Sequence, residues 1–580
     1  ITPENIDSIP DSVLGLDTID LVVFNASGES TLEALSERHR EVISRWITNG
    51  GTALISSGPR GLKMLQQNTW LARSIEADTS SLEEVTMRPA GLETFIASQK
   101  PLEDLPAVAF PTNRGTVLAN ARTDDRRAIP LAITYRHGLG HVIVTPFDLD
   151  SRMFSDWGDR DKLIQRLLED VLTPSDQSDV SASQGYRDMA GQMRASLDRF
   201  GSKPSSPFSV LALGLLALVA LVGPLDYLLI NRLFGQPLLG WITLPVTAVG
   251  IAAITGWIVS QNAVANEDSE TDLRAHRIEI LDIDGFTGTG IGRSFDFFYS
   301  PSAQQADLTF VASKDMQGLS NSSKDDVRSV ASPLGYPGPA YGGIRIAIDQ
   351  NLAPYRPNGL FNLSEDDAPL VRSLPMAPLS THAIEHRFAL DTDVAKDTRL
   401  ITRRGSEFLR GSFTNPLPFD VLDGAIIHAG WIYLLPTRLR AGGRVAAIEG
   451  LSQKNFRWRL IRKKAVENKS TSEDWTPEAT ANIQRLMELM LFYESAGGAK
   501  YTRLAFDEYP ELDLTSTLTP PLGRSDRCIL IGRLAEPMFE IRATPSSEAE
   551  EGEFQLVPQE TTSMVRLVLP VDSPPARKSS

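Results

Sequence analysis

The chain of 580 residues contains almost no cysteine, and Cys528 is its single thiol. One cysteine excludes a disulfide framework within the chain and a cysteine-rich zinc site. Basic residues are also in deficit, because 57 Lys and Arg are set against 73 Asp and Glu, a net charge of −16. Such an acidic chain is a poor candidate for a general nucleic-acid binder. We therefore expect no nucleic-acid partner, and no motif predicts a metal or a cofactor.

The first residues also lack the charged and apolar regions of a signal peptide. The chain begins at Ile1, and its opening residues already look like the interior of a domain. We therefore expect that an N-terminal part is missing and that the first domain is incomplete at its start.

Residues 1–174 show the alternation of an α/β domain. Ser36 is a good N-cap for a helix, and Asn49-Gly50-Gly51 supplies a left-handed stop. Strand, helix and strand in this order predict a parallel sheet. The predicted strands are 19–24, 52–56 and 138–148, and the predicted helices are 37–48 and 159–172.

Two stretches of this region resemble a known family. They read LSERHREVISRWITNGGTALIS, from Leu35, and GLGHVIVTPFDLDSRMFSDWGDRDKLIQRLL, from Gly138. Both are similar to class I glutamine amidotransferase-like domains, in the version found in bacterial membrane proteins of unknown role. Related domains occur in auxiliary proteins of gliding-motility-type transporters. The resemblance implies a flavodoxin-like α/β fold.

The enzymes of this family need a cysteine nucleophile on a sharp strand-to-helix turn, with a histidine and a carboxylate to activate it. Residues 1–174 contain no cysteine and no Gly-x-Ser-x-Gly elbow. The domain is therefore interpreted as degenerate and kept for binding or assembly. The alternative is a diverged hydrolase that uses His141 and Asp148. In the simpler interpretation, His137 and His141 flank a strand, and Asp148 and Asp150 lie in a loop.

Residues 175–206 form a polar linker with a short helix predicted at 186–200, where Met189, Met193 and Leu197 have helical spacing. Two interpretations are open. The helix is either a solvated connector or, given the nearby basic residues, an interfacial helix on a membrane.

Residues 207–260 contain two apolar runs, Phe208–Ile230 and Leu238–Val259. Each has about the 20 residues that a helix needs to cross a bilayer, so the pattern predicts two transmembrane helices in a hairpin. The run GPLDYLLINRLFGQPLLGWITLPVTAV, from Gly223, again resembles the same bacterial membrane proteins. We therefore expect a lipid bilayer as partner and the bacterial inner membrane as location, with two spans.

The turn between the two runs decides the topology. Residues 231–236 are too few for a domain, so both soluble regions lie on one side of the membrane. Arg232 in this turn favours a cytoplasmic turn, which places the soluble regions in the periplasm rather than the cytoplasm. Asp226 is interpreted as a residue near the helix end that pairs with Arg232, not as a functional intramembrane charge.

Residues 261–580 show short apolar stretches separated by Gly and Pro. This pattern predicts a mostly-β, sandwich-like domain of antiparallel strands. One helix is expected between Thr476 and Gly497. Asp282-Ile283-Asp284-Gly285 lacks the later ligands of a calcium loop and is interpreted as a hairpin turn. His382 and His386 do not form the zinc-protease motif.

One basic cluster interrupts the acidic background, at Lys454, Arg457, Arg459, Arg462, Lys463 and Lys464. We interpret it as the solvent face of a strand with Phe456, Trp458 and Leu460 pointing inward. Contact with anionic lipid or with a partner is the alternative.

Taken as a whole, the sequence predicts a non-enzymatic, membrane-anchored scaffold or binding protein, with protein partners in the membrane or envelope. The alternatives are an auxiliary subunit of a transporter and a diverged hydrolase or amidotransferase-like enzyme. No catalytic, cofactor-binding or metal-ligating residue is assigned, and the oligomeric state stays open.

Overall fold

The computed structural model describes most of both soluble regions. The main described ranges are 19–75, 82–110, 115–168, 189–200, 273–302, 304–319, 328–334, 371–377, 380–394, 399–403, 405–461, 483–506, 509–518, 526–545 and 556–572. The predicted membrane hairpin at 207–260, with Asp226 and Arg232, lies outside the described residues apart from isolated positions. Within the described residues, no helix has the length and apolar character needed to cross a membrane.

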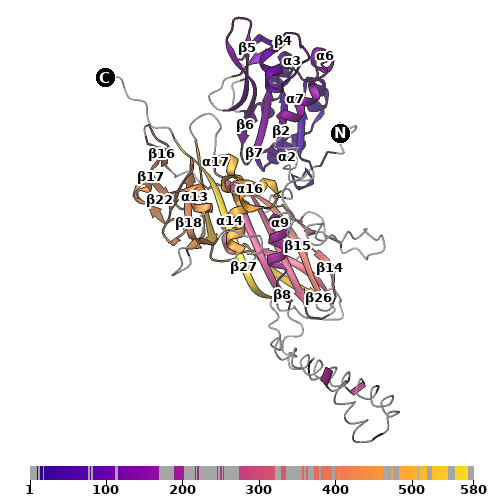
Figure 1. The fold of residues 1–580 in the computed structure, drawn as a ribbon, viewed down its shortest axis with the longest axis vertical. Coiled ribbons are helices and arrows are strands. Elements are labelled where there is room, and N and C mark those ends of the chain that lie inside the picture. Colours follow the sequence, from indigo (N-terminus) through magenta and orange to yellow (C-terminus); the bar gives the residue numbers. More distant parts are fainter. Residues whose placement is uncertain are drawn as a thin grey trace.

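The N-terminal region is a mixed α/β domain built on one seven-stranded sheet (Figure 1). The strands, in sheet order, are β1 (Leu21–Phe24), β2 (Thr52–Ser56), β7 (Gly140–Thr145), β6 (Ala128–His137), β5 (Thr116–Thr123), β3 (Glu83–Arg88) and β4 (Leu105–Ala109). Strands β1, β2 and β7 are parallel, whereas β6, β5, β3 and β4 continue the sheet through antiparallel pairings. The predicted parallel βαβ unit is confirmed.

The flavodoxin-like expectation therefore holds only for the three parallel strands. Strands β6 and β7 are joined by the tight turn Gly138-Leu139, with Gly138 at φ +68°. Such a turn can join only antiparallel neighbours, because parallel strands need a longer crossover.

The helix that precedes β2 matches its prediction closely. Helix α2 (Glu37–Thr48) begins where the Ser36 hydroxyl accepts a hydrogen bond from the His39 amide. It ends before Gly50, at φ +121°. A Cβ added to Gly51 would lie 2.4 Å from the Trp46 ring, so the glycine lets the chain pass close beneath the helix. The cap, the stop and the buried stripe were all visible in the sequence.

The remaining helices of the domain are short. They are α1 (Glu29–Ala34), α3 (Pro59–Gln67), α4 (Thr69–Ala72), α5 (Ala90–Phe95), α6 (Arg152–Ser155) and α7 (Arg160–Leu167). Helix α7 lies inside the range 159–172 predicted for it.

The C-terminal region is β-rich, as expected, and contains one large sheet. Its strands, in sheet order, are β13 (Phe361–Asn362), β11 (Arg328–Pro333), β15 (Ser380–Asp391), β9 (Thr289–Ser300), β8 (Leu273–Asp284), β27 (Leu556–Pro570), β25 (Arg527–Leu534), β18 (Val421–His428), β19 (Trp431–Leu434) and β22 (Ser452–Asn455), with β20 (Arg438–Leu439) beside β18. The central pair β8–β27 is parallel, and the other pairs are antiparallel.

A second sheet covers one face of the large sheet. It contains β12 (Arg356–Pro357), β14 (Val371–Met376), β10 (Gln304–Ala312) and β26 (Phe539–Pro545). Both sheets contribute to one apolar core, which gives this part its sandwich-like character. A smaller sheet contains β16 (Arg399–Thr402), β17 (Leu409–Thr414) and β21 (Arg444–Val445).

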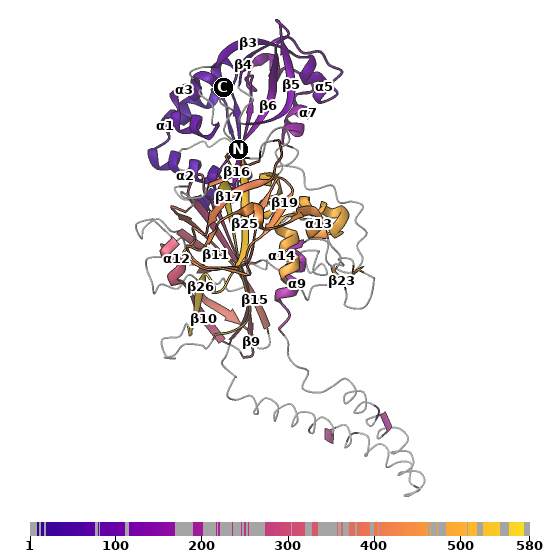
Figure 2. The ribbon, with the colours of Figure 1, turned by 90° about the vertical axis from the view of Figure 1, so that its left-hand side faces the viewer.

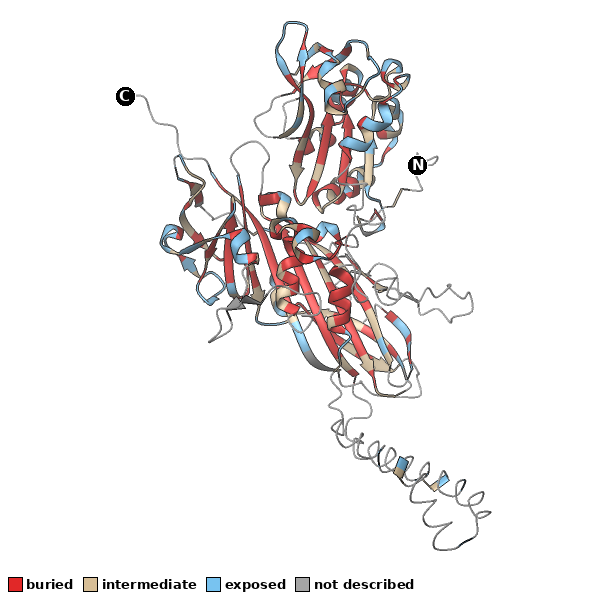
Figure 3. Cartoon of the chain, viewed as in Figure 1, coloured by how far each residue is buried: buried red, intermediate tan, exposed pale blue. Residues whose placement is uncertain are grey.

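Helices cover the opposite face of the large sheet and enclose a second core (Figure 3). They are α9 (Met189–Leu197), α13 (Phe456–Ile461), α14 (Ile483–Leu491), α15 (Tyr493–Ala496), α16 (Gly498–Thr502) and α17 (Thr515–Leu518). Of the predicted long helix, residues 476–482 lie outside the described residues and the rest is divided into α14 and α15, and Gly497, at φ +112°, ends α15 where the stop was expected.

Helix α9 contradicts the interpretation of residues 186–200 as a solvated or interfacial helix. Met189, Met193 and Leu197 are buried in the second core together with α14. The Arg194 side chain is also buried and donates to the Tyr509 hydroxyl at 3.3 Å. The helical spacing was read correctly, but an apolar stripe does not say which distant surface covers it.

Helix α13 corrects the interpretation of the basic cluster. Phe456 to Ile461 form a helix instead of a strand, and Asn455 caps it by accepting from the Trp458 amide. Phe456 and Leu460, four residues apart, are buried, whereas Trp458 is 51% exposed. The alternation of basic and apolar residues suited a strand, but the (i, i+4) apolar pair and the Asn cap favour a helix.

The chain leaves and re-enters the β-rich region at one end. The Leu197 carbonyl is 2.7 Å from Nδ1 of His276, and the Phe200 ring stacks on the His276 ring at 4.3 Å. From this end β8 runs toward the α/β domain, which lies beyond its other end (Figures 1 and 2). The β-rich region therefore separates the α/β domain from the point where residues 201–272 begin and end.

Candidate functional site

The carboxyl ends of β1, β2 and β7 form the edge where parallel α/β sheets commonly bind ligands. Here the edge is occupied by the chain's own side chains. Asp148, only 6% exposed, accepts hydrogen bonds from the Arg60 amide at 3.2 Å and the Gly61 amide at 3.0 Å. These amides belong to the first turn of α3, where a helix attracts anions. The Asp148 carboxylate therefore fills the position that an anionic ligand would use.

A second carboxylate closes the same edge from outside. Asp150 pairs with the Arg60 guanidinium at 2.6 Å and accepts from the Ser27 amide at 2.7 Å. A Cβ added to Gly58 would lie 2.4 Å from the Asp148 amide nitrogen, so the β2–α3 turn packs directly on this loop. The simpler interpretation, in which Asp148 and Asp150 lie in a loop, is confirmed, and that loop caps α3.

Sequence reasoning missed Ser57, whose hydroxyl lies at this edge. It lies at the turn from β2 into α3, is fully buried, and its hydroxyl has no hydrogen-bond partner among the described residues. The turn Ser56-Ser57-Gly58 was its only sequence signal, because the Gly-x-Ser-x-Gly pattern is absent.

The proposed pair of His141 and Asp148 is not brought together. His141 lies at the start of β7, and Asp148 follows the strand's far end. The four residue-to-residue steps from His141 to Thr145 alone span about 13 Å at 3.3 Å per step. Burial, followed by the charges of Arg136 and Arg527, lowers the pKa of His141 to about 3. This ring is therefore a weak base placed at the wrong end of the strand.

His137 and His141 instead flank the turn through which the α/β domain contacts the β-rich region. Arg527 of β25 donates to the Gly138 carbonyl at 3.2 Å and to the Arg136 carbonyl at 3.5 Å. Arg136 in turn donates to the Thr517 hydroxyl at 2.6 Å. We call these contacts, together with those of Phe286 and Leu139, the joint.

Packing reinforces these hydrogen bonds. The Arg527 guanidinium lies 4.4 Å from the centroid of the Phe286 ring, and Leu139 packs against the second core of the β-rich region. A separate ion pair, Arg45–Asp391 at 2.8 Å, links α2 to the end of β15. The joint thus combines a buried cation with an apolar contact, and the separate Arg45–Asp391 ion pair supports it from the side.

The β-rich region contains a buried ionic cluster between its two sheets. Arg277 contacts Asp296 at 2.6 Å and Glu279 at 2.7 Å. Glu279 also accepts from the Ser563 hydroxyl and from the Met538 amide, which ties β8 to β27 and β26. All three charged side chains are nearly inaccessible to solvent, which marks the cluster as a structural element that fixes how the sheets stack.

A second buried ion pair holds the helices to the large sheet. Arg566 is completely buried and contacts both oxygens of Asp282 at 2.6 Å. The same guanidinium donates to the carbonyls of Leu491 and Leu512. Asp282 therefore has a structural partner, and Asp284 accepts from Thr287 in the turn between β8 and β9. The hairpin turn predicted at Asp282–Gly285 is confirmed.

The remaining singled-out residues are dispersed. His386 is fully buried on β15, enclosed by Phe310, Phe388 and Phe539, and neither ring nitrogen has a hydrogen-bond partner among the described residues. His382, on the same strand, contacts the Ser380 hydroxyl. Among the described residues, no group of three potential metal ligands converges.

Cys528 is equally enclosed. The residue is buried in β25, and burial raises the pKa of its thiol. A thiol of this kind is a poor nucleophile, because the thiolate is the reactive form.

Fold and site together define a multidomain protein with an N-terminal mixed α/β sheet and a β-rich C-terminal part. No protein-family model matches the chain, and no curated protein matches it. Among solved structures it is distantly similar to the cytoplasmic protein STM3548 from Salmonella typhimurium, with 15% identity over 29% of this chain and 77% of that chain and a TM-score of 0.22.

Two further solved structures are also distantly similar to this chain. The exo-beta-1,4-mannosidase Op5Man5 from Opitutaceae bacterium strain TAV5 has 15% identity over 30% of this chain and 28% of that chain, with a TM-score of 0.20. The yeast delta-COP-I mu-homology domain complexed with the Dsl1 WxWxV peptide has 7% identity over 52% of this chain and 98% of that chain, with a TM-score of 0.19. At these TM-scores, the similarities carry no functional argument.

Proposed function

We propose that this chain is a non-enzymatic scaffold, anchored in a bacterial inner membrane by residues 207–260, that presents its α/β domain to protein partners in the envelope. The joint is the observation that carries the proposal. The α/β domain uses its β6–β7 turn, flanked by His137 and His141, to attach itself to the β-rich region. Its ligand edge, meanwhile, is filled by Asp148 and Asp150.

The length of β8 sets the height of the proposed scaffold. The strand has 12 residues. The steps between its first and last residue span about 36 Å at 3.3 Å per step. Its first residues lie beside Leu197, where the chain enters and leaves the proposed anchor, and its far end leads to Phe286 at the joint. Phe200 and His276, described residues on either side of 201–272, stack on each other, and a membrane hairpin requires such closely spaced flanks. The β-rich region then acts as a spacer between bilayer and α/β domain.

The proposal is tested by crosslinking in cells. A photoreactive residue replacing Arg152, whose side chain is 94% exposed on the α/β domain, should give discrete crosslinked protein partners. Arg527→Ala should reduce these crosslinks, because the domain is no longer held in place. Arg533→Ala, on the same strand but outside the joint, should leave them unchanged. Crosslinks that persist unchanged with Arg527→Ala would contradict the scaffold.

Two further measurements address activity and topology. Hydrolysis of glutamine or of p-nitrophenyl acetate by the purified chain, abolished by Ser57→Ala or His141→Ala, would establish an enzyme and overturn the proposal. An alkaline-phosphatase reporter fused after Ser580 should be active if the soluble regions are periplasmic, and a silent reporter would contradict that location.

A further inference from the structure

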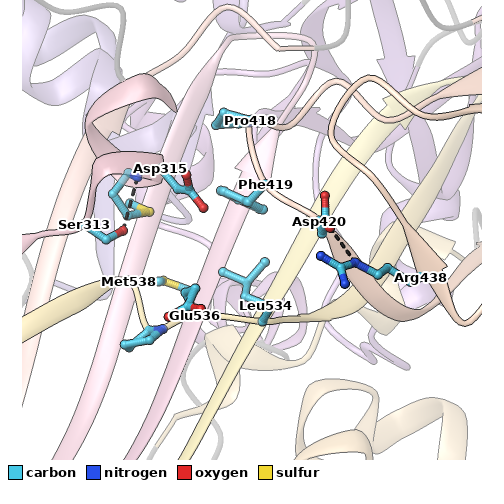
Figure 4. A pocket seen from close by; sticks show the side chains of 12 residues that line it. Ser313, Asp315, Pro418, Phe419, Asp420, Arg438, Leu534, Glu536 and Met538 are labelled. Atoms are coloured by element: carbon cyan, nitrogen blue, oxygen red, sulfur yellow. Dashed lines mark hydrogen bonds and ion pairs between the residues drawn. The ribbon is translucent and has the colours of Figure 1, made fainter.

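A cavity of about 300 Å³ opens at the border of the four-stranded sheet (Figure 4), and no residue of the joint lines it. Helix α12 (Lys314–Leu319), the segment before β18 and the connection from β25 to β26 form its walls. Met316, Phe419 and Met538, each 6% exposed or less, form its floor, the half-buried Pro418, Leu534 and Pro537 supply the more accessible apolar surface, and three carboxylates stand around it. The cavity therefore offers an apolar floor beneath a polar rim, as binding pockets do.

The floor is fixed in place by the protein interior. The Met538 amide donates to Glu279 of the buried ionic cluster at 2.7 Å, and its carbonyl accepts from the Ser313 amide at 2.9 Å. The Phe419 carbonyl accepts from the Asn415 side chain at 3.0 Å. Because these backbone groups are tied down, the cavity is formed before any ligand arrives, and binding costs little ordering of the protein.

The rim carries more negative than positive charge. Arg438 is its one cation, and its guanidinium is already paired with Asp420 at 2.6 Å. The Ala441 amide and then the Arg438 side chain hold the pKa of Asp420 below its usual value. Asp315 and Glu536 have no ion pair with another described residue. Two carboxylates on the rim thus remain available for a cation.

We propose that this cavity binds a protein partner through a lysine or arginine side chain next to an apolar side chain. The apolar side chain would contact Pro418, Leu534 and Pro537 above the floor of methionine and phenylalanine side chains, and the cation would reach Asp315 and Glu536. The volume is at the lower end of the roughly 300–1,000 Å³ usual for small-molecule sites, which suits side chains better than a cofactor. The inference names the chemistry of a partner and so rests on the proposed scaffold function.

The methionine methyl groups allow a direct test. The full chain, labelled with ¹³C at its methionine methyls, is titrated with the peptide acetyl-Leu-Arg-Leu-amide, and Met316→Leu and Met538→Leu identify the two signals. Both signals should shift and saturate. The double substitution Asp315→Asn/Glu536→Gln should weaken binding about tenfold, because it removes two partly exposed charge contacts. Glu540→Gln, an exposed carboxylate of β26 outside the cavity, is the matched control and should change nothing.

Three outcomes would overturn the inference. The first is that the methionine signals show no saturable shift. The second is that acetyl-Leu-Glu-Leu-amide binds as well as the arginine peptide. The third is that hexylamine binds and the peptide does not, which would make the cavity a site for small amines. Each of these leaves the crosslinks of the α/β domain untouched. Conversely, the absence of those crosslinks, or hydrolysis of glutamine or p-nitrophenyl acetate by the chain, would contradict the scaffold proposal. Neither result would change the measured methyl shifts.

Discussion

The joint makes the sharpest prediction, because one side chain, Arg527, donates two of its hydrogen bonds. Arg527 is only 6% exposed, donates to two carbonyls of the α/β domain and stacks on Phe286. A hydrogen bond from a charged donor contributes about 1.5–3 kcal/mol, and Arg527 donates two of them across the joint, whereas its contact with Phe286 lies within the β-rich region and does not count toward docking. Removing Arg527 also relieves its repulsion of Arg136, whose pKa is lowered by burial and then by this neighbouring charge.

We therefore expect Arg527→Ala to weaken docking by about 2–4 kcal/mol, which raises the undocked population about 30-fold or more. Spin labels at Asp161→Cys and Glu540→Cys, both exposed positions, report the separation of the two regions by pulsed electron resonance. Cys528 should stay unlabelled, because it is buried and its thiol pKa is raised.

The unsubstituted chain should give one narrow distance distribution, and Arg527→Ala should broaden it. Arg533→Ala is the matched control, since this arginine is on the same strand and forms an ion pair with Asp423 outside the joint. An unchanged narrow distribution in Arg527→Ala would show that Leu139 and the Arg45–Asp391 pair suffice, and the reasoning about the joint would be refuted.

Two further predictions concern the β-rich region. Arg566→Ala leaves Asp282 buried without its cation, so the free energy of unfolding should fall by about 3–5 kcal/mol in a denaturant titration. Replacing the exposed Arg542 by Ala should change this free energy by less than about 1 kcal/mol. Equal effects of the two substitutions would contradict the structural role of the Arg566–Asp282 pair. Burial, followed by the charge of Arg277, lowers the pKa of His386 to about 3, below the unfolded value of 6.5. The unfolded chain therefore binds the extra proton first, and stability should fall between pH 6.5 and pH 3, by up to about 1.4 kcal/mol per pH unit from this residue. His386→Phe should flatten that acid slope while partly exposed His39→Gln should not, and an unaltered slope would count against the assignment.

Local structure was predictable wherever a few adjacent residues decide it. Ser36 and Gly50 define the ends of α2 through a side-chain cap and a positive φ, and both are visible in the sequence. The order of strand, helix and strand predicts the parallel pairing of β1 with β2 for the same reason. The turn at Asp284 and the stop at Gly497 belong to this class as well.

The candidate sites were harder to predict, because they join residues far apart in the chain. Arg527 contacts Gly138 across 389 positions, and Arg566 contacts Asp282 across 284. The basic residues of α13 misled the sequence interpretation. Over only six residues, apolar side chains that alternate with basic ones fit a strand as well as a helix. The cavity beside Met538 has no sequence signature at all, because three separate segments form it.

The sequence by itself determined β1, β2, β7, α2 and α7 of the α/β domain, and that the chain's one thiol lies outside that domain. It also determined the acidic balance that disfavours nucleic acid. Only the tertiary structure decided that Asp148 fills the ligand edge, that α9 is buried, and that the β6–β7 turn is the joint. The physical reason is that an apolar face or a charged group must be covered by something. Local sequence shows the need for a partner, whereas the packing of distant segments decides which partner meets it.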